Sequence, residues 1–153
     1  MIEDLADSVR AQQAWERARR QLSWQVISCA LRGCDLSLLS FDDVQHECML
    51  HQKIDRGLRD IPLRSIRGSV GRRGDFTIDF LPWRESVQER WKGVWKRTMC
   101  DCLPAIDVFQ VGGMYFVQDG HHRVSAARQA GRESITAHVW EFVVPEACGS
   151  SGG

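Results

Sequence analysis

The chain has 153 residues, 43% of them hydrophobic, and its 20 basic and 20 acidic residues give a net charge of zero. This length fits one domain with an appended segment, and a neutral chain has no overall field that would attract nucleic acid or a membrane. A run of about 20 apolar residues is lacking, and Glu3 and Asp4 lie where a signal peptide would be basic. We therefore expect a cytoplasmic protein with no membrane contact.

The first predicted element is a long helix that ends at Gly33. Its apolar residues recur at roughly helical spacing, with arginines off the stripe. The apolar residues are Leu5, Val9, Trp15, Ala18, Leu22, Val26, Ile27 and Ala30. This helix could pack onto the chain's own sheet, or it could form a homodimer with a second copy.

A second, shorter helix is predicted between Ser40 and Leu58. Ser40, with Asp43 three residues later, has the form of an N-cap, and an apolar pattern follows it. We therefore expect residues 1–58 to be an N-terminal helical extension, and residues 59–145 to be the main domain.

A locally basic segment follows, in which six arginines and two aspartates lie between Asp55 and Arg73. These arginines could contact phosphate or could form a solvated surface. Further along, an amphipathic helix with two tryptophans on its apolar side is predicted. Its apolar residues are Val87, Trp91, Val94, Trp95, Met99 and Cys102. We expect them to belong to the core.

A β-hairpin and a final strand complete the predicted sheet. Residues 106–111 and 114–118 are strand-like and flank Gly112 and Gly113, which tolerate the positive φ angles of a type I′ turn. A period of two from residue 135 to residue 140 indicates the last strand. Residues 146–153 are rich in glycine and serine, which predicts a flexible tail.

The six cysteines are scattered along the chain, without the spacing of a zinc knuckle or a redox pair. We expect free thiols that serve mainly in packing. His46, Cys48 and His51 lie close in sequence, but a second pair of ligands is lacking, so no metal site is expected there.

The most distinctive motif is Asp119-Gly120-His121-His122-Arg123, between the hairpin and a predicted helix that stops at Gly131. The amides of a first helical turn lack acceptors inside the helix, and the helix dipole adds partial positive charge. An anion is stabilised at such a place, and an arginine can hold it with two parallel hydrogen bonds. The motif therefore predicts a phosphate site.

This stretch closely resembles the phosphate-binding signature of the ParB/sulfiredoxin superfamily, which is Gly-x-x-Arg or Gly-x-His-Arg at a helix start. The resemblance covers roughly residues 61–142. Ile61–Ile66 is similar to the family's opening strand and turn, and residues 68–72 lie where the family has its first nucleotide-contacting segment. The resemblance implies an α+β fold, a small mixed sheet packed with helices, that binds a nucleoside triphosphate, CTP or ATP, with a role for Mg²⁺ left open.

Two branches of the superfamily limit what this resemblance implies. Sulfiredoxins have a reactive cysteine directly after the motif glycine, where this chain has His121, so sulfinic acid reduction is not expected. Free serine kinases combine a similar Asp-Gly-His motif with an upstream acidic base. Asp75 and Asp79 match that base by position and not by motif.

The resemblance assigns roles to two groups of residues. The expected nucleotide-binding residues are Gly120, His121, His122 and Arg123 from the motif, and Ser69, Gly71 and Arg72 from the basic loop. The expected catalytic residues are Asp119, His122 and Asp75. Either histidine could contact phosphate or make a structural hydrogen bond, and Asp119 could orient a histidine, help to bind magnesium or cap the turn.

The sequence and the resemblance leave three functions open. The first is a nucleotide-binding domain that hydrolyses the nucleotide or switches on it. The second is a small-molecule kinase of the free-serine-kinase type, in which a carboxylate orients the attacking hydroxyl. The third is a non-enzymatic regulator associated with DNA. A nuclease, the family's historical label, is not favoured, because paired carboxylates with metal-site spacing are lacking near the motif.

Overall fold

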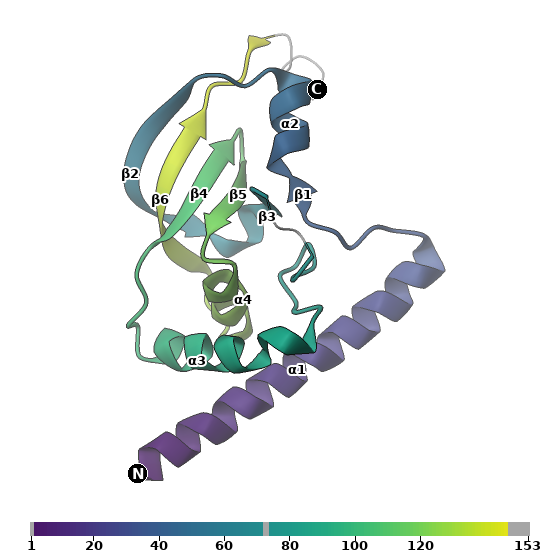
Figure 1. Cartoon of the computed structure of the whole chain (residues 1–153), viewed down its shortest axis with the longest axis vertical. Helices are drawn as coiled ribbons and strands as arrows, with labels where there is room; N and C mark the ends of the chain where they lie inside the picture. Colours follow the sequence, from purple (N-terminus) through teal and green to yellow (C-terminus); the bar gives the residue numbers. More distant parts are fainter. Residues whose placement is uncertain (1, 72–73, 147–153) are drawn as a thin grey trace.

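The computed structural model describes residues 2–71 and 74–146 and shows the expected α+β fold (Figure 1). The helices are α1 (Ile2–Arg32), α2 (Phe41–Cys48), α3 (Gln88–Met99) and α4 (His121–Gln129). The strands are β1 (Leu39–Ser40), β2 (Lys53–Pro62), β3 (Ile66–Ser69), β4 (Ile106–Val111), β5 (Met114–Asp119) and β6 (Ser134–Phe142). Short 3-10 turns at Leu63–Ser65 and Glu85–Val87 complete the order.

The strands form one mixed sheet in the order β1-β3-β5-β4-β6-β2. The pairs β1–β3, β3–β5 and β4–β6 are parallel, whereas β4–β5 and β2–β6 are antiparallel. The predicted hairpin is confirmed as β4 and β5. Of the two turn glycines only Gly112 has a positive φ, 59°, so the turn is not the type I′ that we expected.

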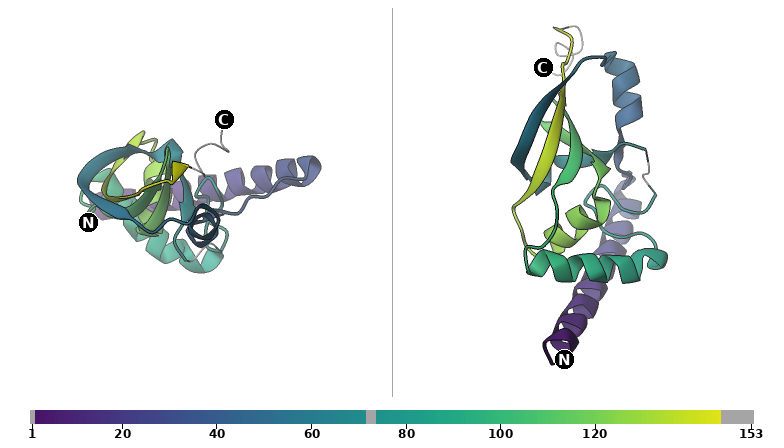
Figure 2. Two further views of the ribbon diagram at one scale, coloured as in Figure 1. Left: turned by 90° about the horizontal axis from the view of Figure 1, so that it is seen from above. Right: turned by 60° about the vertical axis from the view of Figure 1, so that its left-hand side comes forward.

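Three helices lie in layers beneath one end of the sheet (Figures 1 and 2). α4 follows β5 directly, α3 packs on α4, and the middle of α1 packs on α3. Trp91 and Trp95 of α3 are buried, as predicted, and the ring of Trp91 meets Trp15 of α1 edge-on at 5.6 Å between centroids. This core fixes α4, whose start forms the floor of the candidate site.

A second core lies at the other end of the sheet, under α2. Phe41 packs against Phe109, Phe116 and Phe142 at centroid distances of 4.9 to 5.6 Å. The hydroxyl of Ser40 accepts a hydrogen bond from the amide of Asp43, so the predicted N-cap is confirmed. These contacts make α2 part of the packing of the sheet.

The predicted helix is wrong for residues 53–58, which form the first half of β2. β2 pairs with β6 along its whole length and bulges between Asp55 and Gly57, where Gly57 has a φ of 71°. Most of its side chains are exposed, so an alternating apolar pattern is lacking there. A strand at the edge of a sheet needs few apolar residues, which explains the error.

The expectation of free thiols is also wrong for the cysteines that the structure pairs. Cys29 and Cys34 form a disulfide across the end of α1, with Cα atoms 5.1 Å apart. Cys100 and Cys102 pair across Asp101, whose left-handed backbone brings their Cα atoms to 5.4 Å. In both places a tight turn at a helix end folds the chain back, which sequence spacing alone does not reveal.

Both ends of α1 extend past α3, the N-terminal end at the lower left of Figure 1 and the other end at its right. Residues 2–10 are all exposed, and the buried residues lie mainly between Ala11 and Leu22. Within residues 2–71 and 74–146, none of the helices is both long and apolar enough to cross a membrane. Apart from residue 146, the predicted flexible tail at 146–153 lies outside the described residues.

Candidate functional site

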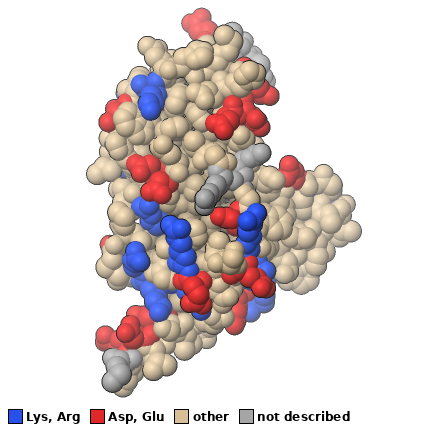
Figure 3. Space-filling view, in the orientation of Figure 1, with Lys and Arg blue, Asp and Glu red and all other residues tan. Residues whose placement is uncertain are grey.

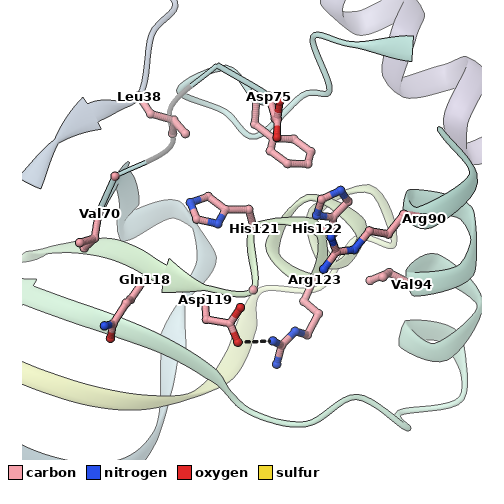
Figure 4. Close-up of a pocket in the computed structure, with 13 residues that line it drawn as sticks. Leu38, Val70, Asp75, Arg90, Val94, Gln118, Asp119, His121, His122 and Arg123 are labelled. Atoms are coloured by element: carbon pink, nitrogen blue, oxygen red, sulfur yellow. Dashed lines mark hydrogen bonds and ion pairs between the residues drawn. The ribbon is translucent and has the colours of Figure 1, made fainter. Parts of the chain in front are cut away.

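A cavity of about 430 Å³ lies where the end of β5, the start of α4, the inner side of α3 and the loop after β3 meet (Figure 4). The predicted residues that line it are Gly71, Asp75, Asp119, Gly120, His121, His122 and Arg123. Of the other two residues predicted in the basic loop, Arg72 lies outside the described residues and Ser69 is not part of the lining. The structure therefore brings most of the predicted residues to one cavity from two distant segments of the chain.

The start of α4 depends on Gly120. This residue has a φ of 114°, and a Cβ atom added to it would lie 2.4 Å from Cγ2 of Ile106. Only glycine fits this turn, which bends the chain sharply from β5 into the helix. The amide of Val124 makes the first helical hydrogen bond, to the carbonyl of Gly120 at 3.0 Å. The amides before it have no acceptor inside the helix, so the helix presents a positive end to the cavity.

Arg123, which lines the cavity, connects the start of α4 to the segment before β4. Its Nη1 donates to the carbonyls of Pro104 and Ala105 at 3.1 and 2.8 Å, and its Nη2 donates to Oδ2 of Asp119 at 3.0 Å. Both terminal nitrogens are thus engaged with the chain itself. The structure gives Arg123 an anchoring role between α4 and the segment before β4, and the phosphate grip that we expected from it stays a prediction.

Ser69 lies behind the cavity wall instead of on it. Its side chain is fully buried, and its Oγ lies 2.6 Å from Nε2 of His121. This hydrogen bond fixes the position of the His121 imidazole at the start of α4. A direct contact between Ser69 and phosphate was expected from the sequence; in the structure this hydroxyl is a partner of His121.

His122 is held as a neutral imidazole. Burial and the nearby charge of Arg90 lower the pKa of His122 to about 4, and the carboxylate of Asp75 acts in the opposite direction. Its ring meets Phe76 edge-on, with centroids 5.1 Å apart. Its Nε2 is buried and has no hydrogen-bond partner among residues 2–71 and 74–146. A buried imidazole nitrogen without a partner is a group that a ligand can satisfy.

Arg90 is the site residue that sequence reasoning missed. It lies on α3 and its side chain points into the cavity toward His122 (Figure 4). Arg90 makes no hydrogen bond or ion pair with any other residue that the structure describes. The sequence gives it no motif, because only the packing of α3 on α4 brings it here.

The two candidate bases differ in position. Asp75 lines the cavity, and its only ion pair among the described residues is a loose one with Arg84, at 3.6 Å. Asp79 lies outside the cavity lining, where Arg67, Arg128 and Gln25 contact its carboxylate. Asp79 therefore links α1, β3 and α4, and Asp75 is the carboxylate that a ligand in the cavity would meet.

The similarity of this chain to known proteins is one of structure. No protein-family model matches the chain, and no curated protein sequence matches it either. A solved structure that is similar to it is sulfiredoxin from Arabidopsis thaliana, with 24% sequence identity and a TM-score of 0.41. That match covers 54% of this chain and 82% of the sulfiredoxin chain.

Proposed function

We propose that the cavity at the start of α4 binds the phosphate groups of a nucleoside triphosphate, CTP or ATP, and that the chain hydrolyses the nucleotide or switches on it. One observation carries this proposal: the positive end of α4 faces the same cavity as the guanidinium of Arg90, which has no ion-pair partner among residues 2–71 and 74–146. Amide groups and a planar guanidinium are the usual partners of phosphate oxygens. The cavity volume is also within the range of small-molecule sites.

The neutral state of His122 suits this ligand. A bound phosphate would place negative charge beside a ring whose pKa is lowered to about 4, and would favour its protonation. Its Nε2, which has no hydrogen-bond partner in the described part of the chain, could then donate to a phosphate oxygen. His122 would in this way gain a proton when the nucleotide binds, which fits a part in phosphate-bond cleavage.

The carboxylates of Asp75 and Asp119 line the same cavity and could supply two of the oxygen ligands that magnesium prefers. A magnesium ion would neutralise phosphate charge there. Asp119 also accepts from Arg123, so metal binding would compete with that ion pair.

A second candidate function is a small-molecule kinase, and the position of Asp75 favours it. Asp75 lies in the lining of the cavity, near His122, where it could accept the proton of an attacking hydroxyl. Replacing Asp75 with Asn should then abolish transfer to an acceptor while nucleotide affinity is kept. Loss of both together would contradict the kinase proposal.

A regulator that binds DNA is a weaker alternative. On the face shown in Figure 3, Lys and Arg side chains gather over and just above α3, with Asp and Glu side chains between them. Such mixed charge gives little of the field that a DNA backbone needs. Binding to DNA, if it is found, should fall steeply with salt.

The proposal is tested by calorimetry with CTP, ATP, ADP and GTP, with and without magnesium, while release of nucleoside diphosphate is followed in the same samples. Arg90→Ala should weaken binding by about tenfold or more, because it removes a charged hydrogen-bond donor. Arg59→Ala, an exposed arginine on β2, is the matched control and should leave affinity unchanged. Failure of every nucleotide to bind would contradict the proposal.

A further inference from the structure

Both overhanging ends of α1 carry exposed apolar side chains with the same spacing. Near the start they are three and four residues apart, and near the end they repeat that spacing. Together they form what we call the outer stripe: Ile2, Leu5, Val9, Trp24, Ile27 and Leu31. Their exposed fractions run from 51% to 85%, which is high for large apolar residues on one helix face.

The outer stripe lies opposite the face by which α1 packs on the rest of the chain. At 3.6 residues per turn, the two exposed triplets point within about 40° of each other. By the same geometry the buried residues, from Ala11 to Cys29, point about 175° away from the stripe. α1 therefore has one apolar side that the chain covers and a second apolar side that it leaves uncovered.

We propose that a second copy of the chain covers the outer stripe, with the two α1 helices antiparallel about a twofold axis near residues 16 and 17. In this register residue i faces residue 33 − i of the partner. Ile2 then faces Leu31, Val9 faces Trp24, and Leu5 lies beside Ile27. Each apolar triplet of one copy is thereby matched by the other triplet of its partner, as a twofold interface requires.

Charged residues in the middle of the outer stripe also favour the antiparallel orientation. Glu16 and Arg20 lie between the two triplets, and Arg20 makes no hydrogen bond or ion pair with any residue in the described part of the chain. In the antiparallel pair, Glu16 lies within one turn of the partner's Arg20, which gives two symmetric ion pairs. A parallel pair would instead place Arg20 against Arg20 and Glu16 against Glu16, which is repulsive.

The available area is sufficient for a specific interface. At a rise of 1.5 Å per residue a helix of this length extends about 46 Å, and a strip about 12 Å wide along it gives about 1,100 Å² for two copies. A specific interface needs about 1,000 Å² or more in total. The two domains would lie on opposite sides of the helix pair. The proposed dimer is argued from α1 alone, so it does not rest on the proposed nucleotide function.

The test is sedimentation velocity of the full chain over about 1 to about 100 µM, where we expect a reversible monomer–dimer equilibrium. Leu5→Glu should raise the dimer dissociation constant by about tenfold or more, because it places a charge in the apolar contact. Leu58→Glu is the matched control: Leu58 is 69% exposed, against 68% for Leu5, but lies on β2. It should leave the equilibrium unchanged.

Charge reversal tests the antiparallel register. Glu16→Arg alone and Arg20→Glu alone should each weaken the dimer, and the double variant should restore it, because the opposite charges face each other again. Circular dichroism is the folding control, and each variant should keep the helix content of the native chain. A chain that stays monomeric at every concentration, a dimer that is indifferent to Leu5→Glu, or a monomer that binds lipid vesicles through the stripe would each overturn the proposal.

Discussion

The helices α4 and α1 differ in how firmly the rest of the chain holds them. α4 has nine residues, and the four from Val124 to Ala127 are buried, while α1 has 31 residues and buries only its middle and the side chain of Cys29. α4 is also fixed at its start by Gly120 and at Ser125 by a buried hydrogen bond from Trp91. A short helix that is buried along its middle and fixed at its start can position chemical groups, whereas a long helix whose two ends extend past the domain presents a surface.

The strongest test of this difference between α4 and α1 is the substitution Gly120→Ala. The new methyl would clash with Ile106, and the residue would be strained at a φ of 114°. We expect unfolding free energy to fall by about 3 kcal/mol in urea titrations. Gly131→Ala is the control, since Gly131 also has a positive φ of 76° but open space around it, and should cost about 1 kcal/mol. Equal losses would contradict the role assigned to Ile106.

A second test removes the hydroxyl that ties α4 to α3. Ser125 accepts from Nε1 of Trp91 at 2.8 Å and donates to the carbonyl of Phe80 at 2.5 Å, and it is fully buried. Ser125→Ala leaves both partners unsatisfied and should cost about 2 kcal/mol in unfolding free energy. Ser23→Ala, an exposed hydroxyl on α1, should cost less than about 0.5 kcal/mol. A small loss at Ser125 would show that α4 is less firmly held than its contacts indicate.

A third test follows the pH dependence of stability. The pKa of His122 is lowered to about 4 in the folded chain, against 6.5 for an ordinary histidine. Between these values the unfolded chain binds more protons, so stability is retained above pH 6.5 and lost as the pH falls toward 4. Since His122 is only partly buried, we expect the contribution to be on the order of 1 to 2 kcal/mol.

The titration of His122 by nuclear magnetic resonance checks this directly. Arg90→Ala removes a positive charge that lowers the pKa and should move the titration midpoint of His122 upward. A midpoint near 6.5 in the native chain would show that the imidazole is not held in a buried, neutral state.

The smallest effect is expected at the free end of α1. Leu5 is 68% exposed, so Leu5→Ala should change the unfolding free energy of the monomer by less than about 0.5 kcal/mol. The measurement is made at protein concentrations below those at which the chain associates. A loss above about 1 kcal/mol would show that this end of α1 packs on its own domain.

Local signals explain which parts of the fold were predictable. Four features were predictable: α1, the Ser40 N-cap, the β4–β5 hairpin and α4. Each is indicated by a helical period, a capping residue or a glycine that lies in the element or within a few residues of it. The first half of β2 lacks such a signal, because it is stabilised by pairing with β6, which lies far along the chain. Its sequence is polar, as the edge of a sheet allows.

The same distinction applies to the candidate site. The Asp119–Arg123 motif is continuous in sequence, and the structure places all of it on the cavity. Arg90 comes from α3, and its approach to His122 depends on how two helices pack. The engagement of Arg123 with the carbonyls of Pro104 and Ala105 likewise depends on the path of the chain before β4. The roles of Arg90 and Arg123 therefore depend on tertiary packing, which no local sequence pattern indicates.

The bulge in β2 has a consequence for how copies of this chain can meet. β2 and β1 are the two edges of the sheet, and β1 has only two residues. β2 is longer, but the bulge at Gly57 interrupts its ladder and Arg56 and Arg59 put charge along it. Strand-by-strand growth into larger sheets, the first step toward fibrils, is therefore hindered at both edges.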